Sequence, residues 1–455
     1  MLKRKIWLAT ILCICITVTS CKKEWLEAKR DKSLVVPVTL SDYQSLLDNT
    51  SIMNLNAPAL GHFSSDDIYI ENSKLNFIYV LPRNAYQWKV DIYEGAPNSD
   101  WDKAYQRIYY ANLVMEGIDK IKVTESNNNE WNMAKGIALF DRSLSFSTLL
   151  DNFSKQFDSA TASTDLGIPL KLTSDINEVA QRSTVNDCYL KIIADLKSAA
   201  DLLPKTYIVN RLLRPSKQAA FAQLARIYLI MGNFDEALFY SNEVLKINST
   251  LMNFSEIDAT KPNYSIAYLN TETLLYTQLL GYSTANIQVN PTVYNLYSDD
   301  DLRKQVYFNV TDLGVFFKGN YSGNSFGLFN GTATDEIYLI RAECYARKNK
   351  IPEAMADLNA LLTTRWKPGT YLPYTATTID DAMNKILVER RKELLFRGIR
   401  WTDLRRLNKE AKYAITLMRQ LESQSIMLLP NDNKYVFAIP DSEILYNNIP
   451  QNNRQ

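Results

Sequence analysis

The chain has 455 residues, of which 46% are hydrophobic and 22% are charged, so it can bury a large core, and a disordered chain is excluded. Its 51 basic and 50 acidic residues nearly cancel, and the first twenty residues hold three of the basic ones and none of the acidic ones, which leaves 48 against 50. Nucleic acid and anionic lipid, which require a basic surplus, are therefore excluded as the main ligand.

The N-terminus has the pattern of an export signal. Residues 3–5 are basic, residues 6–18 form an apolar run, and small residues follow at 19 and 20. This order predicts a secretory signal peptide over residues 1–20.

The end of this signal resembles a bacterial lipobox, because Val18-Thr19-Ser20 is followed directly by Cys21. We therefore expect Cys21 to be lipidated, residues 21–32 to form a tether, and residues 33–455 to form the body. Acyl chains would hold such a body firmly at a membrane, since each buried methylene contributes about 0.8 kcal/mol. An ordinary signal peptide followed by an incidental cysteine is the alternative.

Helical periodicity dominates from residue 101 onward. Apolar side chains recur at three- and four-residue steps through residues 101–150, which predicts a helical hairpin. A further helix is expected to begin at Thr184, where Asp187 completes a capping box, and to end at Pro204.

The most informative pattern is an internal repeat. Residues 224–245 match residues 341–362 at an offset of 117 residues, and the matched pairs include Ala225 and Ala342, Tyr228 and Tyr345, Ala237 and Ala354, and Leu245 and Leu362. This is the spacing of a tetratricopeptide unit, in which small residues let two helices pack closely. Two unrelated amphipathic hairpins are the alternative.

One such helix pair cannot bury its apolar face alone, so neighbouring helices are expected to complete the stack. The sequence therefore predicts a mainly α fold, a tetratricopeptide-like helical-repeat scaffold with hairpins at about 101–150, 184–247 and 335–366. Two stretches, at about 54–98 and 252–334, are rich in Tyr, Asn, Ser, Thr and Gly instead. We expect them to be loop-rich insertions on that scaffold, where binding residues tend to lie.

Few residues point to catalysis or to a bound metal. The single His62 excludes a two-histidine metal motif and leaves no catalytic triad. The acidic run at 299–301 could offer oxygen ligands to calcium, although a helix N-terminus, which favours negative charge, explains it as well. We expect no cofactor and no metal.

Glu389 and Glu393 lie four residues apart on one predicted helix. A pair of carboxylates could serve as acid and base in glycoside hydrolysis. The alternative is a structural network, because abundant arginines would hold both acids ionised and useless as proton donors. The expected partners are Arg390, Arg400, Arg405 and Arg406. We therefore predict that the chain is not an enzyme.

What remains is binding through aromatic and polar side chains. A sugar offers apolar C–H faces and a polar rim, so its site needs flat rings with amide, carboxylate or guanidinium groups beside them. The insertions supply our candidate ligand contacts, which are Arg83, Tyr86, Trp88, Tyr93, Tyr282, Asn286 and Tyr294. Trp88 is the first choice, and packing in the core is the alternative for each ring.

One segment near the C-terminus resembles a known family. Residues 389–406 read ERRKELLFRGIRWTDLRR, which closely resembles the signature segment of the SusD/RagB family. Residues 166–170, 182–185 and 438–440 look like other parts of that family in the same order, so the resemblance spans nearly the whole chain. There are two departures: Arg397 stands where the family usually has an acid, and of the usual closing segment only Gln451-Asn452-Asn453 remains.

The resemblance implies a function and a partner. Members of this family are nutrient-binding lipoproteins, so we expect an outer-membrane, lipid-anchored protein that faces the cell exterior and captures an oligosaccharide or polysaccharide. A SusC-like TonB-dependent outer-membrane transporter would receive the ligand. The alternatives are uptake of peptides, which some relatives perform, a structural adaptor whose repeats bind only protein, and a hydrolase.

Overall fold

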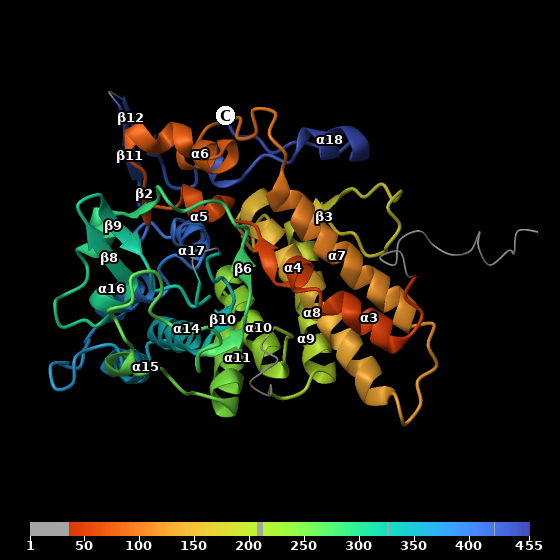
Figure 1. The fold of residues 1–455 in the computed structure, drawn as a ribbon, viewed down its shortest axis with the longest axis horizontal. Helices are drawn as coiled ribbons and strands as arrows, with labels where there is room; N and C mark the ends of the chain where they lie inside the picture. Colours follow the sequence, from red (N-terminus) through yellow and green to blue (C-terminus); the bar gives the residue numbers. More distant parts are fainter. Residues whose placement is uncertain (1–35, 207–212, 325–326, 423) are drawn as a thin grey trace, which may run out of the picture. The chain divides into compact units, whose positions relative to one another are not determined.

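The computed structural model describes residues 36–455 apart from 207–212, 325–326 and 423 (Figure 1). The predicted signal peptide, the lipidation at Cys21 and the tether at 21–32 lie outside the described residues. Contacts divide the chain into two units, Met1–Val38 and Thr39–Gln455, and the description below concerns the second. Within the described residues, no helix is both long enough and apolar enough to cross a membrane.

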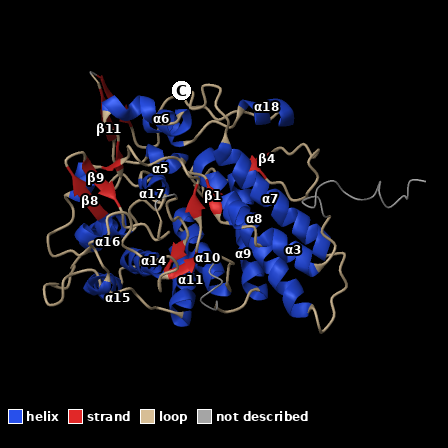
Figure 2. Ribbon diagram, in the orientation of Figure 1, coloured by secondary structure: helices blue, strands red, loops and turns tan. Residues whose placement is uncertain are grey.

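Helices make up most of the regular structure, as Figure 2 shows. The division is 47% helix and 10% strand, which confirms the prediction of a mainly α fold. The α-helices are α3 (Leu40–Leu47), α4 (Thr50–Met53), α5 (Leu60–Ser64), α6 (Val80–Tyr86), α7 (Ser99–Ile118), α8 (Asn128–Phe153), α9 (Val185–Leu202), α10 (Lys217–Met231), α11 (Phe234–Ile247), α12 (Pro291–Tyr294), α13 (Arg303–Tyr307), α14 (Thr334–Arg347), α15 (Ile351–Thr363), α16 (Ile379–Glu393), α17 (Arg400–Leu407) and α18 (Asp441–Asn447).

The strands are short and, among the described residues, pair two at a time. They are β1 (Leu55–Ala57), β2 (Ile68–Tyr69), β3 (Leu166–Pro169), β4 (Arg182–Thr184), β5 (Thr273–Leu275), β6 (Gln278–Leu279), β7 (Gln288–Val289), β8 (Phe308–Thr311), β9 (Gly314–Phe317), β10 (Thr332–Ala333), β11 (Leu417–Leu421) and β12 (Gln424–Leu428). The pairs are β1–β6, which is parallel, and β2–β7, β3–β4, β5–β10, β8–β9 and β11–β12, which are antiparallel.

The first helical hairpin is built around α8, which packs against α7 on one side and α9 on the other (Figure 1). Most of α8 is buried, including the serines at 143, 145 and 147. The cap expected at Thr184 forms, and Asn98 caps α7 as well. The Asn98 side chain accepts a hydrogen bond at the start of α7, and Thr184 accepts the Asp187 backbone N–H at the start of α9.

The internal repeat forms two neighbouring helix pairs. α10 packs on α11, α14 packs on α15, and α11 contacts α14, so the two copies are stacked. The equivalent turn residues Gly232 and Asn349 both have positive φ, 76° and 57°. Ala237 and Ala354 are fully buried, which lets the paired helices approach closely. The tetratricopeptide-like scaffold is thereby confirmed.

The two insertions pair with each other, although they are far apart in the sequence. Leu55 of β1 is in register with Gln278 of β6, and Ile68 of β2 is in register with Val289 of β7. Residues 55–69 and 278–289 therefore lie side by side. Their junction is where residues from both insertions can reach one ligand.

Candidate ligand-binding face

Two of the aromatic residues predicted to touch ligand are packed inside the protein. Trp88 is 4% exposed and Tyr86 is 3% exposed. The Arg419 guanidinium from β11 lies 4.4 Å from the Trp88 ring centre and 3.7 Å from that of Tyr86, and the Trp88 indole N–H donates to the Ser64 carbonyl at 3.0 Å. This burial counts against Trp88 as an exposed platform, because a ligand would reach it only after a rearrangement. Its contact with ligand stays a prediction.

Tyr93 and Arg83 complete the group from the first insertion. Tyr93 is also buried, and its hydroxyl donates to the Ala438 carbonyl at 2.5 Å. Burial raises the Tyr93 pKa well above its ordinary value. Arg83 is partly exposed and pairs with Glu94 at an N···O distance of 3.3 Å. Of the four predicted residues in this insertion, Arg83 is the one with a side chain open to solvent.

The predicted residues of the second insertion, Tyr282, Asn286 and Tyr294, are partly exposed. The Tyr282 ring centre lies 6.4 Å from that of Tyr79, which belongs to the first insertion. Tyr294 packs edge-to-face on Phe308 at 5.2 Å. The structure therefore brings Tyr282 to the junction of the insertions, and the contact of all three residues with ligand stays a prediction.

Exposed rings at this junction were missed in the sequence. Phe77 is 74% exposed and Tyr79 is 66% exposed, whereas Ile78 between them is buried. Phe77, Tyr79 and Tyr282 are called the aromatic edge below. The sequence carries no signal of this exposure, because Phe77, Ile78 and Tyr79 form one hydrophobic run between the end of a 3-10 helix at Phe77 and the start of α6.

Tyr282 of the aromatic edge is held in place by Asp100 at the start of α7. This fully buried carboxylate accepts the Tyr282 hydroxyl at 2.7 Å and the backbone N–H groups of Ala59 and Leu60 at 2.5 and 3.1 Å. Burial raises the Asp100 pKa above its usual range. Because one side chain fixes α5, α7 and Tyr282 together, the Tyr282 ring has little freedom to swing away.

A polar rim lies beside these rings along the chain. Ser283, Thr284 and Asn286 follow Tyr282, and all three side chains are exposed or partly exposed. Hydroxyl and amide groups donate and accept hydrogen bonds, so they suit a ligand with many hydroxyls. Flat rings with such a rim are the arrangement that a sugar requires.

The Glu389 and Glu393 carboxylates belong to a buried ionic network. Arg303 donates to Glu389 at 2.6 Å and to Glu393 at 2.9 Å, and Arg365 donates to Glu393 at 2.8 Å. Asp301, from the acidic run at 299–301, binds the same Arg303. The predicted structural network is confirmed.

The partners expected for this network are wrong. Arg390 and Arg406 bind Asp403 instead, Arg400 binds Asp66, and Arg405 donates to backbone carbonyls. The reason is geometric. Adjacent residues on a helix point in different directions, so Arg390 does not face the partners of Glu389.

Three buried carboxylates, Glu272, Asp335 and Glu393, lie close enough to hold a metal ion. Arg365, however, donates to both Glu272 and Glu393, and Arg397 binds Asp335 through two hydrogen bonds of 2.9 and 2.6 Å. Guanidinium groups thus already supply the positive charge that this cluster requires. Arg397, which departs from the family pattern, has this structural role.

Comparisons with known proteins agree with the fold. One family profile, described as starch-binding and associating with the outer membrane, matches residues 24–229, and the SusD family profile matches residues 334–453. A SusD-like protein of Formosa agariphila is 25% identical over 381 residues, which cover 69% of this chain and 72% of that protein.

Solved structures show the same fold. A SusD superfamily protein of Bacteroides thetaiotaomicron is 22% identical, with a TM-score of 0.73 over 92% of this chain and 100% of the other. A SusD-like carbohydrate binding protein of Bacteroides vulgatus is 20% identical, with a TM-score of 0.68 over 90% and 97%. Since the two profiles match most of the sequence and the helical-repeat body is the one that these structures share, the chain belongs to the SusD/RagB family.

Proposed function

We propose that this protein captures an oligosaccharide or polysaccharide at the cell surface, with the aromatic edge as the binding platform. The observation that carries the proposal is the exposure of Phe77 and Tyr79 at the junction of the insertions, beside a Tyr282 ring that Asp100 holds. Neighbouring exposed rings offer a flat apolar surface, and the C–H faces of a sugar fit it. Family membership and a carbohydrate-binding relative support the same ligand class.

We propose that the protein releases the bound glycan without cleaving its glycosidic bonds. Acid catalysis requires a carboxyl group within hydrogen-bond reach of the glycosidic oxygen, and Glu389 and Glu393 instead accept hydrogen bonds from Arg303 inside the core. Both side chains are almost fully buried, so a glycosidic bond could not approach them.

Delivery requires a membrane anchor and a partner. We propose that Cys21 carries the lipid that holds the protein at the outer membrane, facing outward, and that a SusC-like TonB-dependent transporter receives the glycan. The association of the matched family with the outer membrane supports this location. Labelled palmitate should be incorporated by the intact chain and by a Cys15→Ser control but not by Cys21→Ser.

Replacing Tyr79 by Ala should weaken glycan binding by about 1 to 3 kcal/mol, because it removes an exposed ring from the platform. The measurement is calorimetric titration of the purified body with a panel of neutral and acidic glycans, followed by analysis of the products. Phe239→Ala is the matched control, since Phe239 is 53% exposed on α11, away from the insertions.

If Tyr79→Ala and the wild type bound the glycan with equal affinity, the aromatic edge would not be the binding site. Peptides in the same panel test the main alternative, because an aromatic surface with amides suits them as well. Binding of peptides alone would favour peptide uptake. Release of shortened glycans would favour a hydrolase, and binding of no small ligand would favour an adaptor.

A further inference from the structure

A cluster of exposed apolar side chains lies where α18 meets the loop between β3 and β4. Figure 1 shows the helix and this loop on the same side of the protein, and three hydrogen bonds join the two segments. The cluster, called the α18 face below, consists of Leu172, Ile176, Val179, Leu445 and Tyr446, which are 43%, 71%, 58%, 84% and 55% exposed. Neighbouring apolar side chains that share one patch of surface mark a site of interaction with another molecule.

The orientation of α18 leaves these side chains uncovered. Asn447 is buried and Ile444 is partly buried, whereas Leu445 and Tyr446 are exposed. The helix therefore buries an amide and exposes two large apolar side chains, which is the reverse of an ordinary amphipathic surface helix. This orientation is expected of a helix whose outer side contacts a partner.

Hydrogen bonds hold the α18 face in one conformation. The Tyr446 hydroxyl donates to the Ile176 carbonyl at 3.2 Å, and the Ala180 backbone N–H donates to Asn447 Oδ1 at 3.2 Å. On the other side of the loop, Asn112 of α7 donates to two loop carbonyls at 3.0 and 2.9 Å. A surface that is already ordered loses little conformational entropy when it binds.

Acidic side chains surround the α18 face. Residues 171–182 and 441–450 hold four carboxylates, which are exposed or partly exposed and form no ion pair with a described residue, namely Asp175, Glu178, Asp441 and Glu443. Two basic residues, Lys171 and Arg182, lie on the same segments, and both donate to backbone carbonyls. Four acids against two bases leave a negative rim around the apolar centre.

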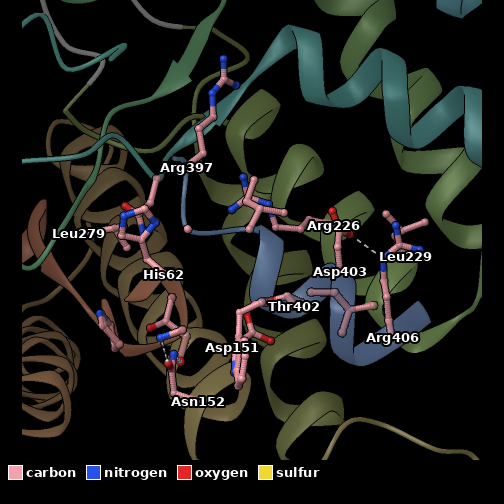
Figure 3. Close-up of a pocket in the computed structure, with 18 of the residues that line it drawn as sticks. His62, Asp151, Asn152, Arg226, Leu229, Leu279, Arg397, Thr402, Asp403 and Arg406 are labelled. Atoms are coloured by element: carbon pink, nitrogen blue, oxygen red, sulfur yellow. Dashed lines mark hydrogen bonds and ion pairs between the residues drawn. The ribbon is translucent and has the colours of Figure 1, made fainter. Parts of the chain in front are cut away.

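Carboxylates in the interior are paired instead. Figure 3 shows Asp403 joined to Arg406 at the wall of a buried cavity, and their N···O distance is 2.7 Å. Glu343 accepts two further hydrogen bonds from the same arginine. The chain thus neutralises these acids where they are buried and leaves those of the α18 face to solvent, where basic groups of another molecule can reach them.

The charge of the rim decides between the possible occupants. A second copy of the chain that docked through the same face would bring acids against acids, and like charges repel. An anionic lipid surface is repelled by the same rim. A protein surface that is apolar at its centre and ringed by Lys and Arg is attracted to it.

We infer that the α18 face docks a partner protein with such a basic rim, and that this partner is the TonB-dependent transporter that receives the glycan. The inference rests on the proposed delivery to a transporter, and it adds the surface through which the two proteins meet. The α18 face shares no residue with the aromatic edge, so docking and glycan binding can be measured separately.

Photo-crosslinking in living cells tests the face directly. Benzoylphenylalanine replaces Leu445 in the tagged full-length chain, and mass spectrometry identifies the protein that is cross-linked on irradiation. The expected product is a TonB-dependent outer-membrane transporter. Leu372 is the matched control position, because it is 81% exposed but lies between α15 and α16, so a probe there should not reach the transporter.

Purification of the wild-type chain from the same cells in mild detergent separates two kinds of failure. If the transporter co-purifies but the probe at position 445 does not reach it, or both probes reach it equally, the α18 face is not the docking surface, although delivery stands. Cross-links to a second copy or to lipid would also overturn the inference. If no transporter co-purifies and none is cross-linked, the proposed delivery itself is wrong and the inference falls with it.

A substitution at the centre of the face gives the second readout. Leu445→Asp should lower the amount of co-purified transporter by at least about tenfold, because a charge replaces an apolar contact. Leu445 is mostly exposed, so the fold and the affinity for glycan should match those of the wild type. Leu372→Asp should retain the full amount of transporter. Equal retention by the two variants would overturn the inference.

Discussion

Replacing Arg365 by Met should lower the free energy of unfolding by about 3 to 5 kcal/mol, because buried Glu272 loses its cation and Glu393 keeps only Arg303. Arg365 is fully buried, and it donates to Glu393 at 2.8 Å, to Glu272 at 2.7 Å and to the Met252 carbonyl at 2.7 Å. Methionine fills a similar volume but cannot satisfy any of these acceptors. Denaturation by urea, followed by circular dichroism, measures the loss.

The surface pair of Arg214 and Asp48 provides the control. Arg214 also binds its carboxylate through two nitrogens, but the two side chains are 20% and 38% exposed, so Arg214→Met should cost less than about 1 kcal/mol. Burial raises the Glu272 pKa, and loss of Arg365 raises it further, so the deficit of Arg365→Met should shrink at lower pH as Glu272 takes up a proton. Equal costs in the two variants would show that burial of the network does not matter.

The helical scaffold could be predicted because its signals are local. The cap at Thr184 needs one side chain within three residues of the helix start, and it forms. The repeat was visible because Ala237 and Ala354 must be small for the same packing reason. Such constraints act within a few residues or repeat at a fixed spacing, so one sequence is enough to reveal them.

The positions of the candidate rings could not be predicted in the same way. Trp88 is shielded from solvent by Arg419, which covers its ring and belongs to a hairpin more than three hundred residues later in the sequence. Composition marks a segment as rich in aromatic residues, but it cannot tell which rings another part of the chain will cover. Residues 77–79 illustrate this, since Phe, Ile and Tyr follow one another in the sequence but only Ile78 of the three is buried.

The cations that pair with Glu389 and Glu393 could not be predicted from the sequence either. The sequence showed that Glu389 and Glu393 needed cations, and the nearby arginines of the signature segment were the obvious candidates. The actual donors, Arg303 and Arg365, lie outside that segment and reach it through the second insertion and the end of α15. A requirement for charge compensation can therefore be predicted from sequence, whereas its source is set by tertiary packing.

Replacing Asp141 is expected to have the opposite effect, a gain in stability. Its side chain lies on α8 and is 5% exposed, and burial raises its pKa to about 7. The positive charge of Arg107 on α7 offsets only part of this rise in the Asp141 pKa, because Arg107 and Asp141 form no ion pair in the described part of the chain. Aspartate in the unfolded chain titrates near 3.9, so the folded state holds the proton more tightly between about pH 4 and pH 7. The contribution of Asp141 to stability therefore falls as the pH rises through that window.

Asp141→Asn should raise the free energy of unfolding by on the order of 2 to 4 kcal/mol at pH 8, where the wild type must bury a charge, and by almost nothing near pH 4, where both side chains are neutral. Urea denaturation of both proteins across this range measures the difference. Asp201→Asn, at an exposed aspartate of α9, controls for the loss of one charge and should leave stability nearly unchanged at either pH. If the gain from Asp141→Asn were the same at pH 4 and pH 8, ionisation of a buried Asp141 would not be its cause, and the raised pKa would have to be abandoned.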